Sequence, residues 1–125
     1  MAIKDMRIAF TTDASGDAVV YGEASIRARL LAVMYDYGDA ATGADLTLTT
    51  DQYAVVESLF VVADLGVADA IWYPRHILHN NANGVVLVGA NGGDREPCLI
   101  IGRPKITIAQ GGNAKSGAFI LIYEE

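Results

Sequence analysis

A chain of 125 residues is long enough to bury a core of its own, and this sequence predicts a single domain over residues 1–125. Its nine Lys and Arg against fifteen Asp and Glu give a formal net charge of −6, which argues against a nucleic-acid partner because phosphate binding needs clustered cations. The longest apolar run, around 55–63, contains Glu57 and is far shorter than the ~20 residues of a membrane-spanning helix. The N-terminus lacks the apolar core of a signal peptide, and the single cysteine fits a reducing cytoplasm.

The first half of the chain predicts strands separated by short turns. The turn at 13–17 separates a strand at 6–12 from one at 18–21 and indicates a hairpin. A long strand follows over 25–37. Polar and apolar residues alternate in it up to Leu30, with Arg27 and Arg29 on an exposed face, and beyond Leu30 it is apolar on both faces. This change predicts that the strand passes beneath a neighbouring element or subunit.

The middle of the chain contains one clear strand and one ambiguous segment. Leucine and threonine alternate over 46–50, as in a half-buried strand. The segment 52–64 has apolar residues at helical spacing, but its valines favour a strand, which is the interpretation we prefer. A further strand is predicted over 68–73, and Pro74 ends it because proline cannot donate to a ladder.

The last third continues the same pattern. Turns rich in Asn and Gly at 80–84 and 91–94 enclose a short strand at 85–88, and another strand covers 97–101. The terminal stretch 103–125 predicts two strands joined by a glycine-rich loop, in a wide hairpin. The whole pattern is typical of an all-β fold, and we predict a compact antiparallel β-sandwich or jelly-roll-like domain of about eight or nine strands.

Two groups of side chains have ligand-like spacing. His76 and His79 are three residues apart, but zinc needs three or four ligands, so we interpret them as loop histidines. Asp36, Asp39 and Asp45 surround two glycines, as in a weak calcium site, although their spacing does not match the calcium-binding loop. Asp in loops more often bonds the backbone of its own turn. The sequence therefore predicts no metal and no cofactor.

No arrangement of nucleophile and base is evident. Cys98 has no activating base near it in the sequence, and we interpret it as a small buried hydrophobe at the start of a strand. The stretch 111–116 contains two glycines, a lysine and a serine, but not the spacing of a phosphate-binding loop. We predict no catalytic residues and a chain that is not an enzyme.

Aromatic and aliphatic residues suggest contact surfaces instead. Trp72, Tyr73, Tyr35 and Tyr37 fit either a sugar-binding face or, as we prefer, the core and subunit contacts. The last strand, 118–123, is apolar on both faces, so one face is expected to pack in the core and the other against a neighbouring copy. The candidate interface residues are Phe119, Leu121, Tyr123, Met34 and Tyr35.

Five segments, in the same order along most of the chain, resemble a group of small virion proteins of tailed bacteriophages. They are 7–17, 30–35, 42–48, 71–75 and 105–117. These motifs are structural rather than catalytic. The resemblance implies a virion structural protein, most like a capsid decoration (cement) protein that stabilises the head by bridging capsomers.

This resemblance also implies partners and a location. The partners would be the major capsid protein and copies of the chain itself, in a homotrimer, with no nucleic acid and no membrane. The protein would be made in the host cytoplasm and lie on the capsid surface of the virion, where an acidic chain is tolerated. The alternatives are a tail, baseplate or head-fibre component, or a carbohydrate-binding module on the virion surface.

Overall fold

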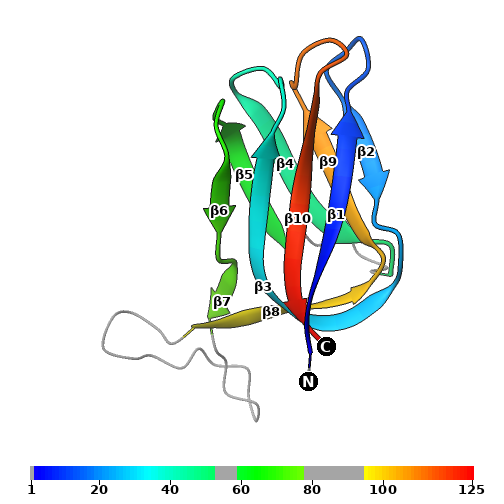
Figure 1. The fold of residues 1–125 in the computed structure, drawn as a ribbon, viewed down its shortest axis with the longest axis vertical. Coiled ribbons are helices and arrows are strands. Elements are labelled where there is room, and N and C mark those ends of the chain that lie inside the picture. The colour runs from blue at the N-terminus through cyan, green and yellow to red at the C-terminus, as the bar shows by residue number, and fades with distance from the viewer. Residues whose placement is uncertain (1, 53–58, 78–94) are drawn as a thin grey trace.

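The computed structural model describes residues 2–52, 59–77 and 95–125, which form two antiparallel β-sheets packed face to face (Figure 1). The described ranges contain strands and connecting turns and no helix, so the all-β sandwich prediction is confirmed. Sheet I is formed by β1 (Ile3–Thr11), β10 (Ser116–Glu124), β3 (Ile26–Tyr37), β8 (Arg95–Gly102) and β7 (Arg75–Ile77), and β6 (Ala70–Trp72) also pairs with β3. Sheet II is formed by β2 (Ala18–Tyr21), β9 (Pro104–Ala109), β4 (Ala44–Thr50) and β5 (Phe60–Leu65).

The strand order is that of a jelly roll. Sheet I runs β1-β10-β3-β8 and sheet II runs β2-β9-β4-β5, so β1 and β2, β3 and β4, and β9 and β10 lie in different sheets. The hairpins predicted at 13–17 and between the two C-terminal strands are therefore wrong. Each of these turns instead carries the chain from one sheet to the other. A turn signal in the sequence marks where a strand ends, but not which strand its successor pairs with.

The three crossing loops, 13–17, 38–43 and 110–115, are hydrogen-bonded to one another at one end of the sandwich. The N–H of Gly111 donates to the carbonyl of Gly16 (2.8 Å), and the N–H of Ala41 donates to the carbonyl of Gly111 (2.9 Å). The buried Thr12 hydroxyl donates to the carbonyl of Gly112 and accepts from the N–H of Lys115. These bonds satisfy the backbone groups of loop residues that are buried, such as Gly16 and Gly111.

A β-bulge in β3 explains its change of pattern. Ile122 pairs with Ala32 and Tyr123 with Leu30, which leaves Leu31 without a partner on β10. The extra residue shifts the alternation by one position, so Leu30 and then Val33 face the core while Met34 faces outward. The bulge accounts for the change of pattern, and the expectation that a neighbouring element or subunit covers this strand stays a prediction. Its apolar stretch changes phase at the bulge, and Ala32 (4% exposed) and Val33 (1%) are both buried there.

The same point of β3 lies between two partners on its other side. β8 pairs with β3 up to Leu30, and β6 pairs with it from Val33 onward. The side chain of Arg75 lies at this junction, where its Nη1 donates to the carbonyls of Leu31 (3.0 Å) and Pro74 (2.7 Å). The guanidinium thus replaces the missing strand partner of Leu31. Pro74 itself separates β6 from β7, which confirms that it ends the predicted strand.

The core fills the space between the two sheets with aliphatic and aromatic side chains. Phe119 is fully buried, and its ring stacks on Tyr35 (4.9 Å between centroids) and Phe10 (5.8 Å). The leucines of β4 face inward, which confirms the predicted alternation over 46–48, whereas Thr49 and Thr50 are both buried. The strand predicted over 97–101 is confirmed as part of β8, and Cys98 is buried there.

Some predictions fall partly or wholly outside the described residues. Of the ambiguous segment 52–64, residues 53–58 lie outside, and the described remainder contains the start of strand β5. The predicted strand at 85–88, its flanking turns and His79 also lie outside the described residues.

The phenol of Tyr35 gives a prediction for stability. Its hydroxyl is buried and has no hydrogen-bond partner among the described residues, and burial raises the pKa of the phenol above its ordinary value. We expect Tyr35→Phe to stabilise the fold by about 1 kcal/mol at neutral pH, because it removes an unsatisfied buried group. Urea unfolding checks this, and Tyr73→Phe, at a residue 62% exposed, is the neutral control.

The raised pKa also predicts a pH dependence. Above pH 10.0, the ordinary tyrosine pKa, the unfolded chain releases this proton while the folded protein retains it. The contribution of Tyr35 to stability is therefore constant below this pH and falls as the pH rises toward the folded-state pKa. Tyr35→Phe should reduce the fall without abolishing it, because burial also raises the pKa of Tyr123. A destabilising Tyr35→Phe would show that the hydroxyl has a partner in solution.

Candidate functional site

Four of the five predicted interface residues line the core. The exposed fractions are 0% for Phe119 and Leu121, 5% for Tyr123 and 2% for Tyr35, so these side chains are not available to a neighbouring subunit. This part of the prediction is corrected. Odd-numbered residues of β10 point inward because the strand pairs on both sides within sheet I and faces sheet II. Met34, 37% exposed, is the one candidate on the outer side.

The outer face of sheet I contains a row of side chains aligned by strand pairing. Arg7 on β1 lies opposite Ile120 on β10, Ile120 opposite Met34 on β3, and Met34 opposite Ile71 on β6. We call these four residues the outer row. Ile71 is 44% exposed and Ile120 is half-buried, so the middle of the row offers apolar surface to solvent or to a partner. Burial of such surface contributes about 25 cal/mol per Å².

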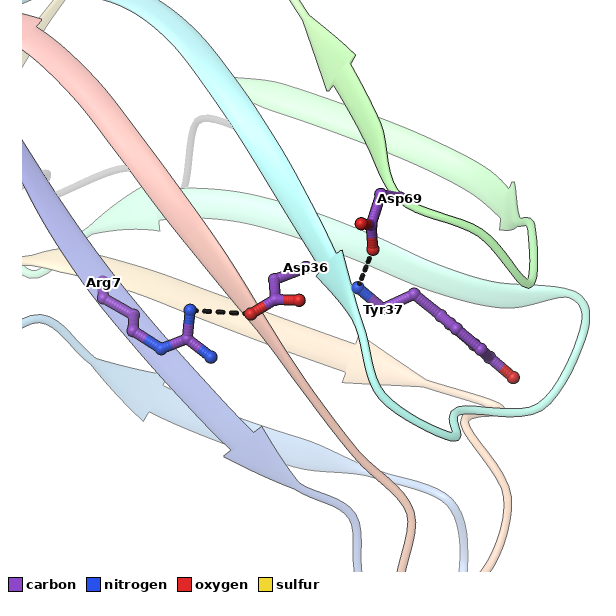
Figure 2. Close-up of polar contacts among 4 residues, drawn as sticks. All are labelled: Arg7, Asp36, Tyr37 and Asp69. Carbon is purple, nitrogen blue, oxygen red and sulfur yellow. Dashed lines mark hydrogen bonds and ion pairs between the residues drawn. The ribbon is translucent and has the colours of Figure 1, made fainter.

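A shallow groove follows this row, and its rim is polar. Its volume is about 360 Å³, and its lining includes Met34, Ile120, Ile71, Asp36 and Asp69. The Arg7 guanidinium pairs with Asp36 (2.8 Å), and Asp69 accepts a hydrogen bond from the Tyr37 N–H (2.8 Å), as Figure 2 shows. An apolar floor with partnered charges at its edge suits contact with another protein surface.

The same face continues past the bulge toward the other end of sheet I. Arg27 lies opposite Ile101, and Arg29 lies opposite Leu99. Both arginines are exposed, which confirms the exposed strand face predicted for them. Leu99 and Ile101 are 60% and 43% exposed. The face thus combines apolar side chains with charges that can orient a partner.

The outer face of sheet II is different in character. One row runs Val19, Thr107, Thr47 and Val61 across its four strands, and the two valines at its edges are 57% and 56% exposed. Its middle is threonine rather than isoleucine or methionine. Sheet I therefore offers the more apolar of the two outer faces at its centre.

The aspartates weighed as calcium ligands each have a different partner. Asp36 pairs with Arg7, Asp39 accepts from the Ser116 N–H (2.7 Å), and Asp45 accepts from the Asp64 N–H (3.1 Å). Across the described ranges, no group of three or more His, Cys, Asp or Glu side chains could hold a metal ion. These carboxylates stabilise loops and strand ends, as Asp commonly does in turns.

The other candidates for chemistry lie in structural positions. His76 is on β7, opposite Glu96, and not in a loop as predicted, because the strand resumes directly after Pro74. Burial raises the pKa of the Cys98 thiol, which keeps it protonated at neutral pH. In the glycine-rich loop, the N–H groups of Gly111 and Lys115 bond within the protein instead of facing an open phosphate site.

The aromatic residues divide between the core and the surface. Trp72 packs against the core and contacts Tyr35 (6.5 Å between centroids) and Phe60 (5.7 Å), which confirms the interpretation we preferred for it. Tyr37 meets the edge of Tyr35 (6.1 Å). Tyr73 is 62% exposed. The four aromatics therefore do not form one exposed platform for a sugar.

Ile120 and Ile71 were not identified from the sequence as surface residues of interest, although they supply apolar surface in the outer row. Ile120 belongs to the other face of the last strand, and its alternation with Phe119 and Leu121 was the available signal.

The described part of the chain has no helix long and apolar enough to cross a membrane. Comparison of the chain with protein-family models, with curated proteins and with solved structures found no match. The fold and the site thus define a jelly-roll β-sandwich with an apolar outer face.

Proposed function

We propose that this chain is a non-enzymatic structural protein of a bacteriophage virion that decorates the capsid and binds the major capsid protein through the outer face of sheet I. The observation that carries the proposal is the outer row, with Ile120, Met34 and Ile71 in register and charges at the rim. Jelly rolls also occur among viral shell proteins, which is support by analogy. The sequence resemblance to small virion proteins points the same way.

Stabilisation of a capsid follows from the physics of this face. Burial of the outer row against a capsomer contributes about 25 cal/mol per Å² before the cost of association. Each contact is weak, but many copies on one lattice oppose expansion and rupture together. The net charge of −6 keeps the chain away from packaged DNA and is compatible with the outer surface of the shell.

Rebinding to capsids that lack the protein tests the proposal. Purified protein is expected to bind such capsids saturably and to raise their resistance to heat and osmotic shock. Ile71→Arg should weaken binding about tenfold or more, because it places a long charged side chain in the apolar contact. Val61→Arg is the matched control, since Val61 is similarly exposed but lies on sheet II.

Other outcomes identify the alternatives. Absence of rebinding would contradict capsid decoration and favour a tail, baseplate or head-fibre component. Equal losses for both variants would contradict the use of sheet I. Saturable binding to a glycan array would support a carbohydrate-binding module, and that binding would depend on the exposed Tyr73.

A further inference from the structure

Among the described residues, no strand pairs with the outer edge of β1, the first strand of sheet I. β1 lies at the end of the sheet and pairs with β10 over nine residues in an unbroken register. The hydrogen bonds at the two ends of β1 show which of its residues bond to β10. Ala2 exchanges two backbone hydrogen bonds with Glu125, and the Thr12 N–H donates to the carbonyl of Lys115. Because these groups alternate along a strand, the even-numbered residues bond to β10. The N–H and C=O groups of Ile3, Asp5, Arg7 and Ala9 therefore point away from the sheet.

The other sheet edges are shorter or irregular. In the described ranges, β2 has four residues and β7 has three, and β5 has an irregular register with β4 and a positive φ of 61° at Asp64. β1 contains neither proline nor bulge, which are two of the devices that block an edge, although it contains charged residues. Its Lys4 is held by its own chain, 3.6 Å from Glu125. β1 is thus the edge best suited to receive another strand.

The side chains of β1 fit a second copy of the same strand. Two copies related by a two-fold axis pair antiparallel, and their outward-pointing backbone groups meet only if odd residues lie opposite odd residues. With the axis at Met6, Asp5 lies opposite the partner's Arg7, and Arg7 opposite the partner's Asp5. A shift of the axis to Asp5 or to Arg7 places two like charges opposite each other. Charge complementarity therefore selects the register centred on Met6.

The same register also pairs the apolar residues of the edge. Ile3, the most exposed large hydrophobic side chain described at 69%, lies opposite the partner's Ala9. The pairing adds about eight main-chain hydrogen bonds and joins the two copies of sheet I into one continuous sheet. Arg7 can take part while it contacts Asp36, because a guanidinium carries five N–H donors.

We propose that two copies of this chain associate through their β1 edges, in an antiparallel two-fold pair with Asp5 opposite Arg7. The pairing places the outer faces of both copies of sheet I on the same side. The proposed pairing concerns the free chain in solution, and it differs from the homotrimer that the sequence resemblance implies.

Sedimentation velocity over a concentration series tests this pairing. The wild-type chain is expected to form a reversible dimer with about twice the 13.2 kDa mass of one chain. Asp5→Arg and Arg7→Asp should each raise the dissociation constant about tenfold or more, since each places like charges opposite one another at two sites. Arg27→Asp, on the same face but away from the edge, is the control and should leave it unchanged.

A mixture of the two variants gives the decisive result. An Asp5→Arg chain and an Arg7→Asp chain place opposite charges at both sites when they pair, so the mixed dimer should form where neither variant dimerises alone. This rescue also shows that both variants are folded. In the wild-type dimer, the amides of Asp5 and Arg7 should exchange slowly with solvent.

Three results would overturn the pairing. The first is a wild-type chain that stays monomeric at all concentrations, and the second is a homotrimer, which a single two-fold edge contact does not produce. The third is an Asp5→Arg variant that associates as well as the wild type.

Discussion

Phe119→Ala is expected to destabilise the protein by about 3–5 kcal/mol, a large share of the total stability of a domain of this size. The side chain is fully buried between the sheets and stacks on the rings of Tyr35 and Phe10. Its removal takes apolar area from the core and leaves a cavity that the two flanking strands, β1 and β3, hold open. Urea unfolding followed by circular dichroism measures the change.

The neighbouring residue is the matched control for this variant. Ile120 lies one position further along the same strand but on the outer face, and Ile120→Ala should cost about 1 kcal/mol or less. Should Phe119→Ala fail to fold, Phe119→Leu keeps most of the volume and should cost less than about 1.5 kcal/mol. Similar losses for Phe119→Ala and Ile120→Ala would contradict the inward orientation of Phe119.

Gly38→Ala is the second substitution with a large expected effect, about 3 kcal/mol of destabilisation or more. Gly38 begins the loop that leads from β3 in sheet I to β4 in sheet II. A Cβ at this position would overlap the carbonyl oxygen of Ser116 and come within 2.9 Å of its carbonyl carbon. These are backbone atoms, and the Ser116 carbonyl also accepts a hydrogen bond from the Asp39 N–H (2.9 Å). Neither backbone segment can therefore move away without losing this hydrogen bond.

Gly66→Ala tests the same chemical change where there is room for it. A Cβ on Gly66 would meet no heavy atom within 4 Å. We expect it to be neutral or to stabilise by about 0.4–1 kcal/mol, because alanine restricts the unfolded chain. Thermal unfolding of both variants makes the comparison. A Gly38→Ala protein as stable as the wild type would show that the loops at this end are not packed against each other as described.

Most strand positions followed from the sequence, with β7 as an exception, whereas strand partners did not. The alternation of leucine and threonine identifies the strand at 46–50 because the period of two is a local property, although Thr49 and Thr50 are both buried. Pairing depends on contacts far along the chain, and a turn such as 13–17 has the same composition whether it joins neighbours in one sheet or crosses to the other. For this reason two crossing loops were interpreted as hairpins.

The bulge at Leu31 and the orientation of the last strand show the same limit. The extra residue in β3 changes the phase of the alternation, and Leu31 and Val33 on either side of this change are both apolar. The sequence alone does not distinguish such a change of phase from burial of both faces of the strand. In β10 both alternating sets, Phe119 with Leu121 and Ile120 with Ile122, are apolar. Which set faces the core depends on the position of sheet II, so the candidate interface was placed on the wrong side of the strand.

The proposed function leads to one direct measurement, a density map of the virions in which this chain is proposed to be a component. We expect jelly-roll density on the outer surface of the capsid, at junctions between capsomers. The outer face of sheet I, with Ile120 and Ile71, should lie against the shell. Density for this chain in the tail or baseplate, or its absence from the virion, would contradict capsid decoration.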